Sequence, residues 1–162
     1  MNFRLYTFVA NHYLSPLQCG LQTAHVVSEL SRGHALSSAR EAYAEWADRD
    51  KTIIICAGGN HQGVLECHAE LVRTADGALG MPVALFCEDE QSMNGMATAC
   101  GVIVPQCYWD VVFENGLDNG LGYPRWVHAQ VDDTGAVIAL HEYPLTHPEG
   151  QFVNHLKSFR LA

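Results

Sequence analysis

The sequence predicts a single α/β domain in which helices flank a small mixed sheet. The chain has 162 residues, of which 48% are hydrophobic, and this is enough for one domain with its own core. Short runs of aromatic and β-branched residues alternate with stretches of helical periodicity. Near the C-terminus, two apolar runs flank a turn sequence, which predicts an added hairpin.

The first part of the chain predicts a strand followed by two helices. Asn2 to Ala10 is a short aromatic and β-branched run, typical of a buried strand. Ser15-Pro16 supplies an N-cap with proline at the first helical position, and apolar residues then recur at helical spacing until Ser31-Arg32-Gly33. A second amphipathic helix is expected over Ser37 to Ala47.

The middle of the chain predicts a strand, a helix and a further strand. Lys51 to Ala57 is expected to be a central strand, because Ile53-Ile54-Ile55 shows no polar alternation and both faces would be covered. Gly58-Gly59-Asn60 makes the turn into a helix over His61 to Ala75, which leads to a strand over Pro82 to Cys87. This order predicts a right-handed crossover unit.

An acidic group, Glu88-Asp89-Glu90, follows that strand. It precedes a short helix expected over Ser92 to Cys100 and a strand over Gly101 to Pro105. The C-terminal ends of strands are where open α/β sheets bind ligands, so these carboxylates could share a proton or hold a cation. The alternative is a solvated acidic turn that caps the Ser92 helix through its dipole.

The last third of the chain predicts an addition to this core. Glu114 to Tyr123 is rich in glycine and asparagine and predicts a loop. Trp126 to Val131 and Ala136 to Tyr143 flank Asp132-Asp133-Thr134-Gly135, which indicates a hairpin. A terminal helix is expected over Pro148 to Phe159, with its apolar residues docked on the body.

Aromatic side chains gather around the glycine-rich loop. Tyr108, Trp109, Tyr123 and Trp126 could stack on a planar base or anchor a protein interface. The alternative is that they simply pack the added hairpin against the body.

Two further groups of residues are candidates for ligand binding. The free amides of Gly58-Gly59-Asn60, between a strand and a helix, could meet a phosphate or a carboxylate, or the segment could be an ordinary turn. Gln18, Gln22 and His25 are spaced by three or four residues and share one face of the first helix. They could line the polar edge of a site, or His25 could be a core histidine bonded to a backbone carbonyl.

The charge balance bears on the class of partner. The formal net charge is −9, and the nine lysines and arginines are not concentrated in any segment. Extended contact with RNA or DNA is therefore disfavoured, because such proteins present clustered basic residues to the phosphate backbone. A small anionic ligand held by a few backbone amides remains compatible with this composition.

The cysteines and the apolar runs predict a cytoplasmic protein without membrane contact. Six cysteines are scattered singly, several of them in apolar runs, as expected for reduced core thiols. No run approaches the roughly 18 apolar residues of a membrane span, and no signal peptide is recognisable. Cys67-His68 with His61 or Cys56 is a poor zinc pattern without a Cys-x-x-Cys partner. No nucleophile motif is present, so we assign no metal, cofactor or nucleophile.

The chain resembles the type II peptidyl-tRNA hydrolase family over about Asn2 to Pro105. The resemblance rests on the order and spacing of three strands, which lie at Leu5 to Ala10, at Thr52 to Ala57 and before Cys87-Glu88-Asp89, and of the helix that carries Gln22-Thr23-Ala24-His25. It implies a three-layer α/β/α domain around a four-stranded mixed sheet, with residues 1–105 as the core and 106–162 as an addition. The family is usually dimeric and releases the peptide from peptidyl-tRNA.

Two positions depart from the family pattern. Gln18 stands where the family carries a lysine implicated in catalysis, and an amide cannot offer a positive charge to phosphate or to a developing oxyanion. The family's Asp-Ala-Gly-x-Thr segment falls on Glu88 to Ser92 or on Asp89 to Met93, where the acid is kept and the Ala-Gly pair is not.

These features predict a non-hydrolytic, homodimeric protein that binds or sequesters a small nucleotide-like ligand. One alternative is an active peptidyl-tRNA hydrolase, with Asp89 or Glu88 orienting a water molecule and His25 assisting as base. Another is a protein-interaction module, whose acidic surface pairs with a basic partner. The expected ligand-binding residues are Gln18, Gln22, Gly58, Gly59, Asn60, Ser92, Trp109 and Trp126.

Overall fold

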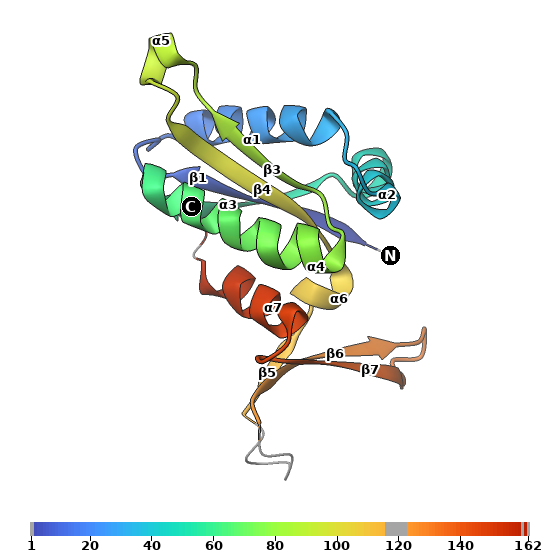
Figure 1. Ribbon diagram of the computed structural model, residues 1–162. Coiled ribbons are helices and arrows are strands. Elements are labelled where there is room, and N and C mark those ends of the chain that lie inside the picture. Colours follow the sequence, from blue (N-terminus) through green and yellow to red (C-terminus); the bar gives the residue numbers. More distant parts are fainter. Residues whose placement is uncertain (1, 116–122, 160, 162) are drawn as a thin grey trace.

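The protein contains two β-sheets of different size. A computed structural model describes residues 2–115, 123–159 and 161. The larger sheet has four strands in the order β2-β1-β4-β3, and the smaller sheet has three antiparallel strands in the order β5-β6-β7 (Figure 1). The strands are β1 Phe3–Ala10, β2 Thr52–Gly59, β3 Val83–Cys87, β4 Ala97–Pro105, β5 Val112–Glu114, β6 Arg125–Val131 and β7 Val137–Pro144.

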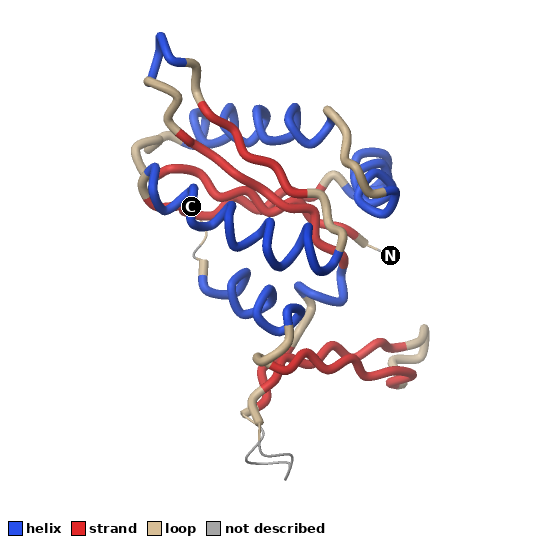
Figure 2. The backbone as a smooth tube through the Cα atoms, viewed as in Figure 1, coloured by secondary structure: helices blue, strands red, loops and turns tan. Residues whose placement is uncertain are grey.

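Helices cover both faces of the four-stranded sheet, so the core is the three-layer α/β/α arrangement with a mixed sheet (Figure 2). One face is covered by α1 and α2, and the other by α3 with α7 beyond it (Figure 1). The helices are α1 Pro16–Ser31, α2 Ser37–Glu45, α3 His61–Leu71, α4 Gly77–Leu79, α5 Glu90–Met93, α6 Gln106–Trp109 and α7 Pro148–Ser158, with π-helical turns at Trp46–Asp50 and Val72–Asp76.

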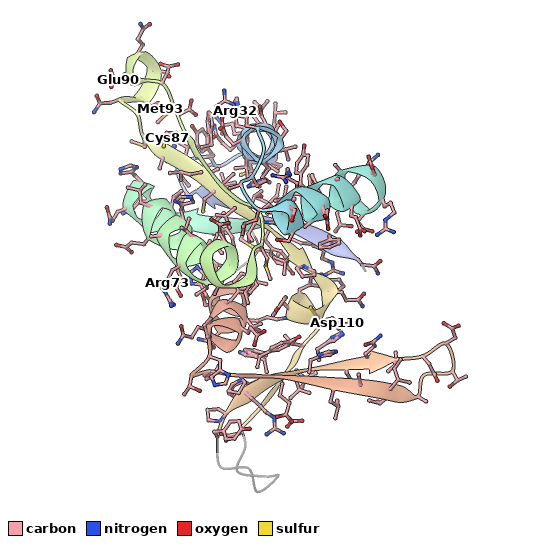
Figure 3. All side chains as sticks on the ribbon, turned by 45° about the vertical axis from the view of Figure 1, so that its right-hand side comes forward. Arg32, Arg73, Cys87, Glu90, Met93 and Asp110 are labelled. Atoms are coloured by element: carbon pink, nitrogen blue, oxygen red, sulfur yellow. The ribbon has the colours of Figure 1, made fainter. Side chains whose placement is uncertain are left out.

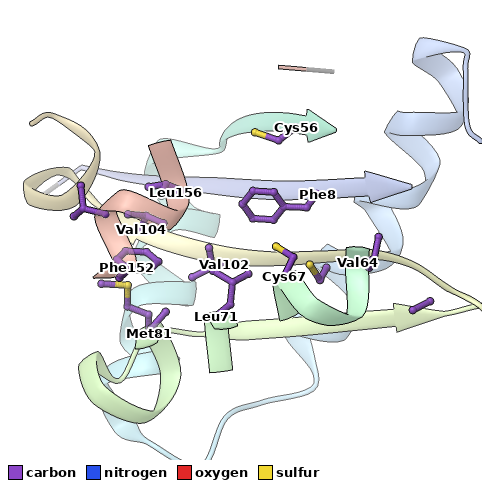
Figure 4. Close-up of a cluster of buried hydrophobic side chains, with 14 of the residues drawn as sticks. Phe8, Cys56, Val64, Cys67, Leu71, Met81, Val102, Val104, Phe152 and Leu156 are labelled. Carbon is purple, nitrogen blue, oxygen red and sulfur yellow. The ribbon is translucent and has the colours of Figure 1, made fainter. Parts of the chain in front are cut away.

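The sheet is mixed because β4 runs against its neighbours. Strand β1 pairs in parallel with β2 and antiparallel with β4, and β3 also pairs antiparallel with β4. The two central strands, β1 and β4, are the most deeply buried. On the α3 side, Phe8 and Val102 pack against Leu71 and Phe152, which come from α3 and α7 (Figure 4). On the α1 side, Leu5 and other buried residues form a second apolar cluster.

The predicted central position of the strand at Lys51 to Ala57 is wrong. Strand β2 lies at one edge of the sheet and β3 at the opposite edge, so they are not neighbouring parallel strands. The isoleucine run was informative about burial only: Ile54 packs on the α3 side and Ile55 on the α1 side, while Ile53 is 41% exposed. The neighbouring parallel pair is β1 and β2, which α1 and α2 connect.

The helix predicted over Ser92 to Cys100 is also wrong. The helical turn α5 ends at Met93, and Asn94 and Gly95 follow with φ of 52° and 68°. Ala97 then begins β4, which pairs with β1 on one side and β3 on the other. Small residues such as these have little intrinsic preference for a strand, so tertiary pairing decides their conformation.

The added part of the chain forms the predicted hairpin and terminal helix. Strands β6 and β7 project from the body (Figure 1), and Asp132 organises their turn by accepting hydrogen bonds from the backbone of Thr134 and Ala136. The predicted loop Glu114 to Tyr123 lies largely outside the described residues. Within the described residues, no helix has the length and apolar character needed to cross a membrane.

All six cysteines are unpaired, as the sequence predicts. Cys56, Cys67 and Cys100 are buried, and Cys19 and Cys107 are half-buried. The prediction of core positions is wrong for Cys87, which is exposed at the end of β3.

Helix α7 packs very closely on the end of β7, and this contact requires Gly150. A Cβ atom at Gly150 would overlap the carbonyl oxygen of Pro144 and lie 2.7 Å from that of Tyr143. We expect Gly150→Ala to destabilise the protein by about 1–3 kcal/mol, since backbone must move to relieve the overlap. Urea unfolding followed by circular dichroism measures the change.

Gly20→Ala is the matched control. Nothing lies within 4 Å of a Cβ atom at Gly20, in the interior of α1, so alanine there should stabilise the protein by roughly 0.5–1 kcal/mol. Equal effects of the two substitutions would contradict the close contact at Gly150.

Candidate functional site

A chain of hydrogen bonds connects four elements at one end of the sheet. The Glu88 Oε1 atom, just after β3, accepts from the Tyr13 hydroxyl at 2.8 Å and from the Gln22 Nε2 atom at 2.9 Å. The Gln22 Oε1 atom in turn accepts from the Thr98 hydroxyl at 2.8 Å. We call these four residues the Glu88 network. Both ends of the Gln22 amide are therefore bonded, and its orientation is fixed.

Burial makes this network obligatory. Gln22 lies on the inner face of α1 and is 5% exposed, and Thr98 in β4 is fully buried. A buried amide or hydroxyl that lacks a hydrogen-bond partner costs about 1–3 kcal/mol, so the two side chains must satisfy one another. The second polar group of Gln22 then reaches the carboxylate at the end of β3.

Tyr13 is held as a neutral hydrogen-bond donor. Burial, together with the hydrogen bond and negative charge of Glu88, raises the pKa of the Tyr13 hydroxyl to about 12. The phenol therefore stays protonated across the physiological range and keeps donating to Glu88. Its hydroxyl also lies 3.5 Å from the sulfur of Met93.

Tyr13 also forms part of the wall of an apolar groove of about 480 Å³. The groove lies where the parallel strands β1 and β2 end and α1 begins, which is the edge where α/β sheets commonly bind ligands. No charged side chain is among its lining residues. The lining is Val9, Ala10, Asn11, Tyr13, Leu14, Pro16, Cys19, Ile55 and Ala57.

Few polar groups border this groove. The Cys19 thiol donates to the Tyr13 carbonyl at 3.4 Å, so the two residues hold each other in place. Asn11 is exposed, and its backbone amide donates to the Gly59 carbonyl at 2.7 Å. The arrangement can enclose a compact apolar body and offer hydrogen bonds at its edge.

The predicted polar edge of the first helix does not form as a unit. Gln18 completes the capping box of α1, because its side-chain Oε1 accepts from the Ser15 amide and hydroxyl while its backbone N–H donates to Ser15 Oγ. His25 is exposed and stacks on the Phe86 ring, with centroids 4.2 Å apart and planes 7° apart. Of the three, only Gln22 joins the Glu88 network. His25 is also not the buried core histidine that was the alternative.

The acidic segment divides into two roles. Glu88 belongs to the network, whereas Asp89 caps α5 by accepting from the Ser92 amide at 2.7 Å. The Ser92 backbone and hydroxyl hydrogen bonds lower the pKa of the exposed Asp89 carboxyl. For Asp89 and Ser92 the structure therefore supports the helix-capping alternative.

The glycine turn has structural reasons for its composition. Gly58 lies so close to β1 that a Cβ atom would come within 2.9 Å of the Phe8 carbonyl carbon, and Gly59 has a φ of 82°. Asn60 caps α3 by accepting from the Gly63 amide at 2.9 Å. None of these three residues lines the groove.

The two tryptophans lie away from this end of the sheet. The Arg4 guanidinium stacks over the Trp109 ring at 3.4 Å from its centroid, and Trp126 in β6 packs edge-on against Phe113. Both tryptophans also pack against the apolar cluster on the α3 side. They therefore serve packing between the body and the second sheet.

The zinc pattern weighed in the sequence does not come together. In the part of the chain that the structure describes, no group of three or more His, Cys, Asp or Glu side chains could hold a metal ion. His61 instead accepts from the Ala97 amide at 2.9 Å through Nδ1, and burial lowers the pKa of His68.

Tyr13, Thr98 and Cys19 are the site residues that the sequence did not reveal. Tyr13 and Glu88 are 75 positions apart, and Gln22 and Thr98 are 76 apart, so no local spacing joins them. The available signal was the position of Tyr13 directly after a strand, in the loop that leads to α1.

The coupling between Glu88 and Tyr13 can be measured. In Glu88→Gln the hydrogen bond can persist but the negative charge is lost, so the pKa of Tyr13 should fall from about 12 while burial keeps it above the ordinary 10.0. A titration followed by NMR at the tyrosine Cζ carbon measures this shift. Glu90→Gln, an exposed position on α5, is the control and should leave Tyr13 unchanged. An unaltered Tyr13 titration in Glu88→Gln would contradict the coupling.

Comparison with known proteins does not assign a family to this arrangement. The chain matches no protein-family model, and no curated protein is significantly similar to it. A proposal for its function therefore depends on the groove and on the Glu88 network.

Proposed function

We propose that the protein is a non-hydrolytic binding protein that holds a small neutral ligand in the groove beside Tyr13. The observation that carries this proposal is the groove itself. Its volume of about 480 Å³ falls within the range of about 300–1,000 Å³ typical of ligand pockets, and its lining is largely apolar with a few polar groups at one side.

The lining favours an uncharged ligand. A phosphate group would find neither lysine nor arginine among the groove residues, and Glu88 lies directly behind Tyr13. Among nucleotide-like molecules, a nucleoside or a free base therefore fits better than a phosphorylated nucleotide. The side-chain amide of the exposed Asn11 is the group available to bond its polar atoms, because the Cys19 thiol and the Asn11 backbone amide already donate to carbonyls of the protein.

The residues expected to act in hydrolysis are occupied by structural contacts. Asp89 caps α5, Glu88 accepts hydrogen bonds from Tyr13 and Gln22, and the His25 ring lies flat on Phe86. A general base must reach the proton that it removes, directly or through one water molecule. These contacts favour binding over catalysis.

The architecture supports a core like that of the type II peptidyl-tRNA hydrolase family. A four-stranded mixed sheet between helical layers is what the resemblance implies. Gln22 belongs to the segment that carries the resemblance, and it donates a hydrogen bond to Glu88. In one of the two possible alignments, Glu88 is the first residue of the family's acidic segment. The missing lysine at Gln18 distinguishes this chain from the hydrolases.

The proposal includes a homodimer that acts in the cytoplasm. Leu14, Leu17 and Leu21 are 87%, 74% and 54% exposed, and a second copy could cover them, which sedimentation equilibrium would test. The six unpaired cysteines favour a reducing compartment.

Ligand binding is tested with nucleosides and their monophosphates. We expect at least one nucleoside to shift the amide NMR signals of Asn11, Tyr13 and Cys19, and its monophosphate to bind more weakly. Ala57→Phe should abolish these shifts, because the ring would fill the groove. Ala129→Phe, at an exposed position of strand β6, makes the same change elsewhere and should leave them intact. Silence across the panel would remove the nucleoside proposal.

The non-hydrolytic character is tested with peptidyl-tRNA. Purified protein should release peptide no faster than buffer, and Gln18→Lys should stay inactive, because the other polar groups keep their structural roles. Robust release that Asp89→Asn abolishes would establish the hydrolase alternative instead.

A further inference from the structure

A second groove, of about 710 Å³, lies between the β6–β7 hairpin, α6 and the first turn of α7. Its lining includes Tyr108, Asp110, His128, His141, Tyr143 and Glu149. Asp110 marks its position between α6 and the hairpin (Figure 3). We propose that this groove binds an organic cation that carries a guanidinium or alkylammonium group. The site belongs to residues 106–162 and is independent of the groove beside Tyr13.

The carboxylates give the lining of this groove a negative charge. Two carboxylates, Asp110 and Glu149, line the groove, and neither lysine nor arginine does. Asp110 has a cation in electrostatic range, because Lys157 interacts with its charge while donating to the Trp109 carbonyl at 2.7 Å. The charge of Glu149 is therefore less compensated than that of Asp110 and more available to a ligand.

The effect of Glu149 extends across the groove. The Tyr108 hydroxyl lies 3.5 Å from Glu149 Oε1. Burial, together with the charge of Glu149, raises the pKa of Tyr108 and of Tyr143. Both causes also raise the pKa of the Cys107 thiol, although its contact with Tyr143 opposes them. All three side chains therefore stay protonated and neutral, and the negative charge of the groove comes from the two carboxylates.

His128 adds a hydrogen-bond acceptor. The residue is 8% exposed, and Nδ1 lies 2.7 Å from the Asp110 carbonyl oxygen. A carbonyl only accepts, so Nδ1 carries the hydrogen, and in the neutral ring Nε2 is left with its lone pair. His141, directly opposite on β7, places a second imidazole beside it with centroids 6.0 Å apart.

Two tyrosines supply aromatic surface for a cation. The rings of Tyr108 and Tyr143 lie with centroids 5.1 Å apart, and both line the groove. An ammonium or guanidinium group near such rings is attracted by their electron-rich faces. Carboxylate, imidazole nitrogen and aromatic faces together complement a cation with several N–H donors.

A bare metal ion fits the groove less well. Among the described residues no group of three or more potential ligands comes together, and the volume is far larger than an ion needs. The same chemistry could come from a free polyamine or from an arginine side chain of a peptide. Both present the donors that this lining accepts.

Agmatine, which carries a guanidinium and an ammonium group, is the probe. We expect calorimetry to show binding that weakens with salt, and Glu149→Gln to weaken it roughly ten-fold or more, because a charge-assisted hydrogen bond is lost. Glu66→Gln, an exposed carboxylate on α3, makes the same change of charge elsewhere and should bind as the wild type does.

Two further measurements identify which kind of molecule supplies the cation and check that the variant is folded. A Gly-Arg-Gly peptide amide that binds more tightly than agmatine would indicate a peptide arginine, and the reverse order would indicate a free polyamine. At one agmatine concentration, the NMR signal of the His128 ring should move further in the wild type than in Glu149→Gln, whose folded spectrum is checked first. No binding at millimolar agmatine, or equal affinity in Glu149→Gln, would overturn the proposal. Neither result bears on nucleoside binding beside Tyr13.

Discussion

The burial of the central antiparallel pair β1 and β4 is the constraint on which the candidate site depends. At Gly101, where β4 passes under α1, a Cβ atom would lie 2.7 Å from Val26 Cγ1, so the helix can approach only because glycine is there. This close approach buries Gln22 and Thr98 against each other. Since neither can remain without a partner, the hydrogen bonds continue outward to Glu88 and Tyr13.

The network in turn shapes the groove. Tyr13 is bonded to Glu88 by its hydroxyl and to Cys19 by its carbonyl, so its ring has little freedom at the groove wall. A groove with a fixed wall loses little conformational entropy when a ligand enters, which favours binding by a small contact area. The polar residues of the network thus fix the position of the groove wall, while the lining itself is largely apolar.

Local signals in the sequence were sufficient for some elements and not for others. Ser15 and Pro16 specify the start of α1, and the Asp132 turn specifies the hairpin, because each signal acts within a few residues. The first half of β4 carried no such signal, because Ala97 and its small neighbours become a strand only by pairing with β1 and β3. The site shows the same division. Glu88 was predicted from its place after a strand, whereas its contact with Tyr13 required the folded chain.

The pairing of the basic residues, and not only the net charge, disfavours binding of a polynucleotide. Four arginines pair with glutamates, and Arg4 is stacked on Trp109, so their charges are already engaged by neighbours. Binding a polynucleotide requires cations that can exchange counterions for phosphates, and such pairs would first have to separate. Neither groove is lined by a lysine or an arginine. The two grooves are therefore better suited to the neutral and cationic ligands proposed for them than to phosphates, through local pairing of the basic residues as well as through the overall charge. The four pairs are Arg32–Glu29, Arg49–Glu45, Arg73–Glu70 and Arg125–Glu114.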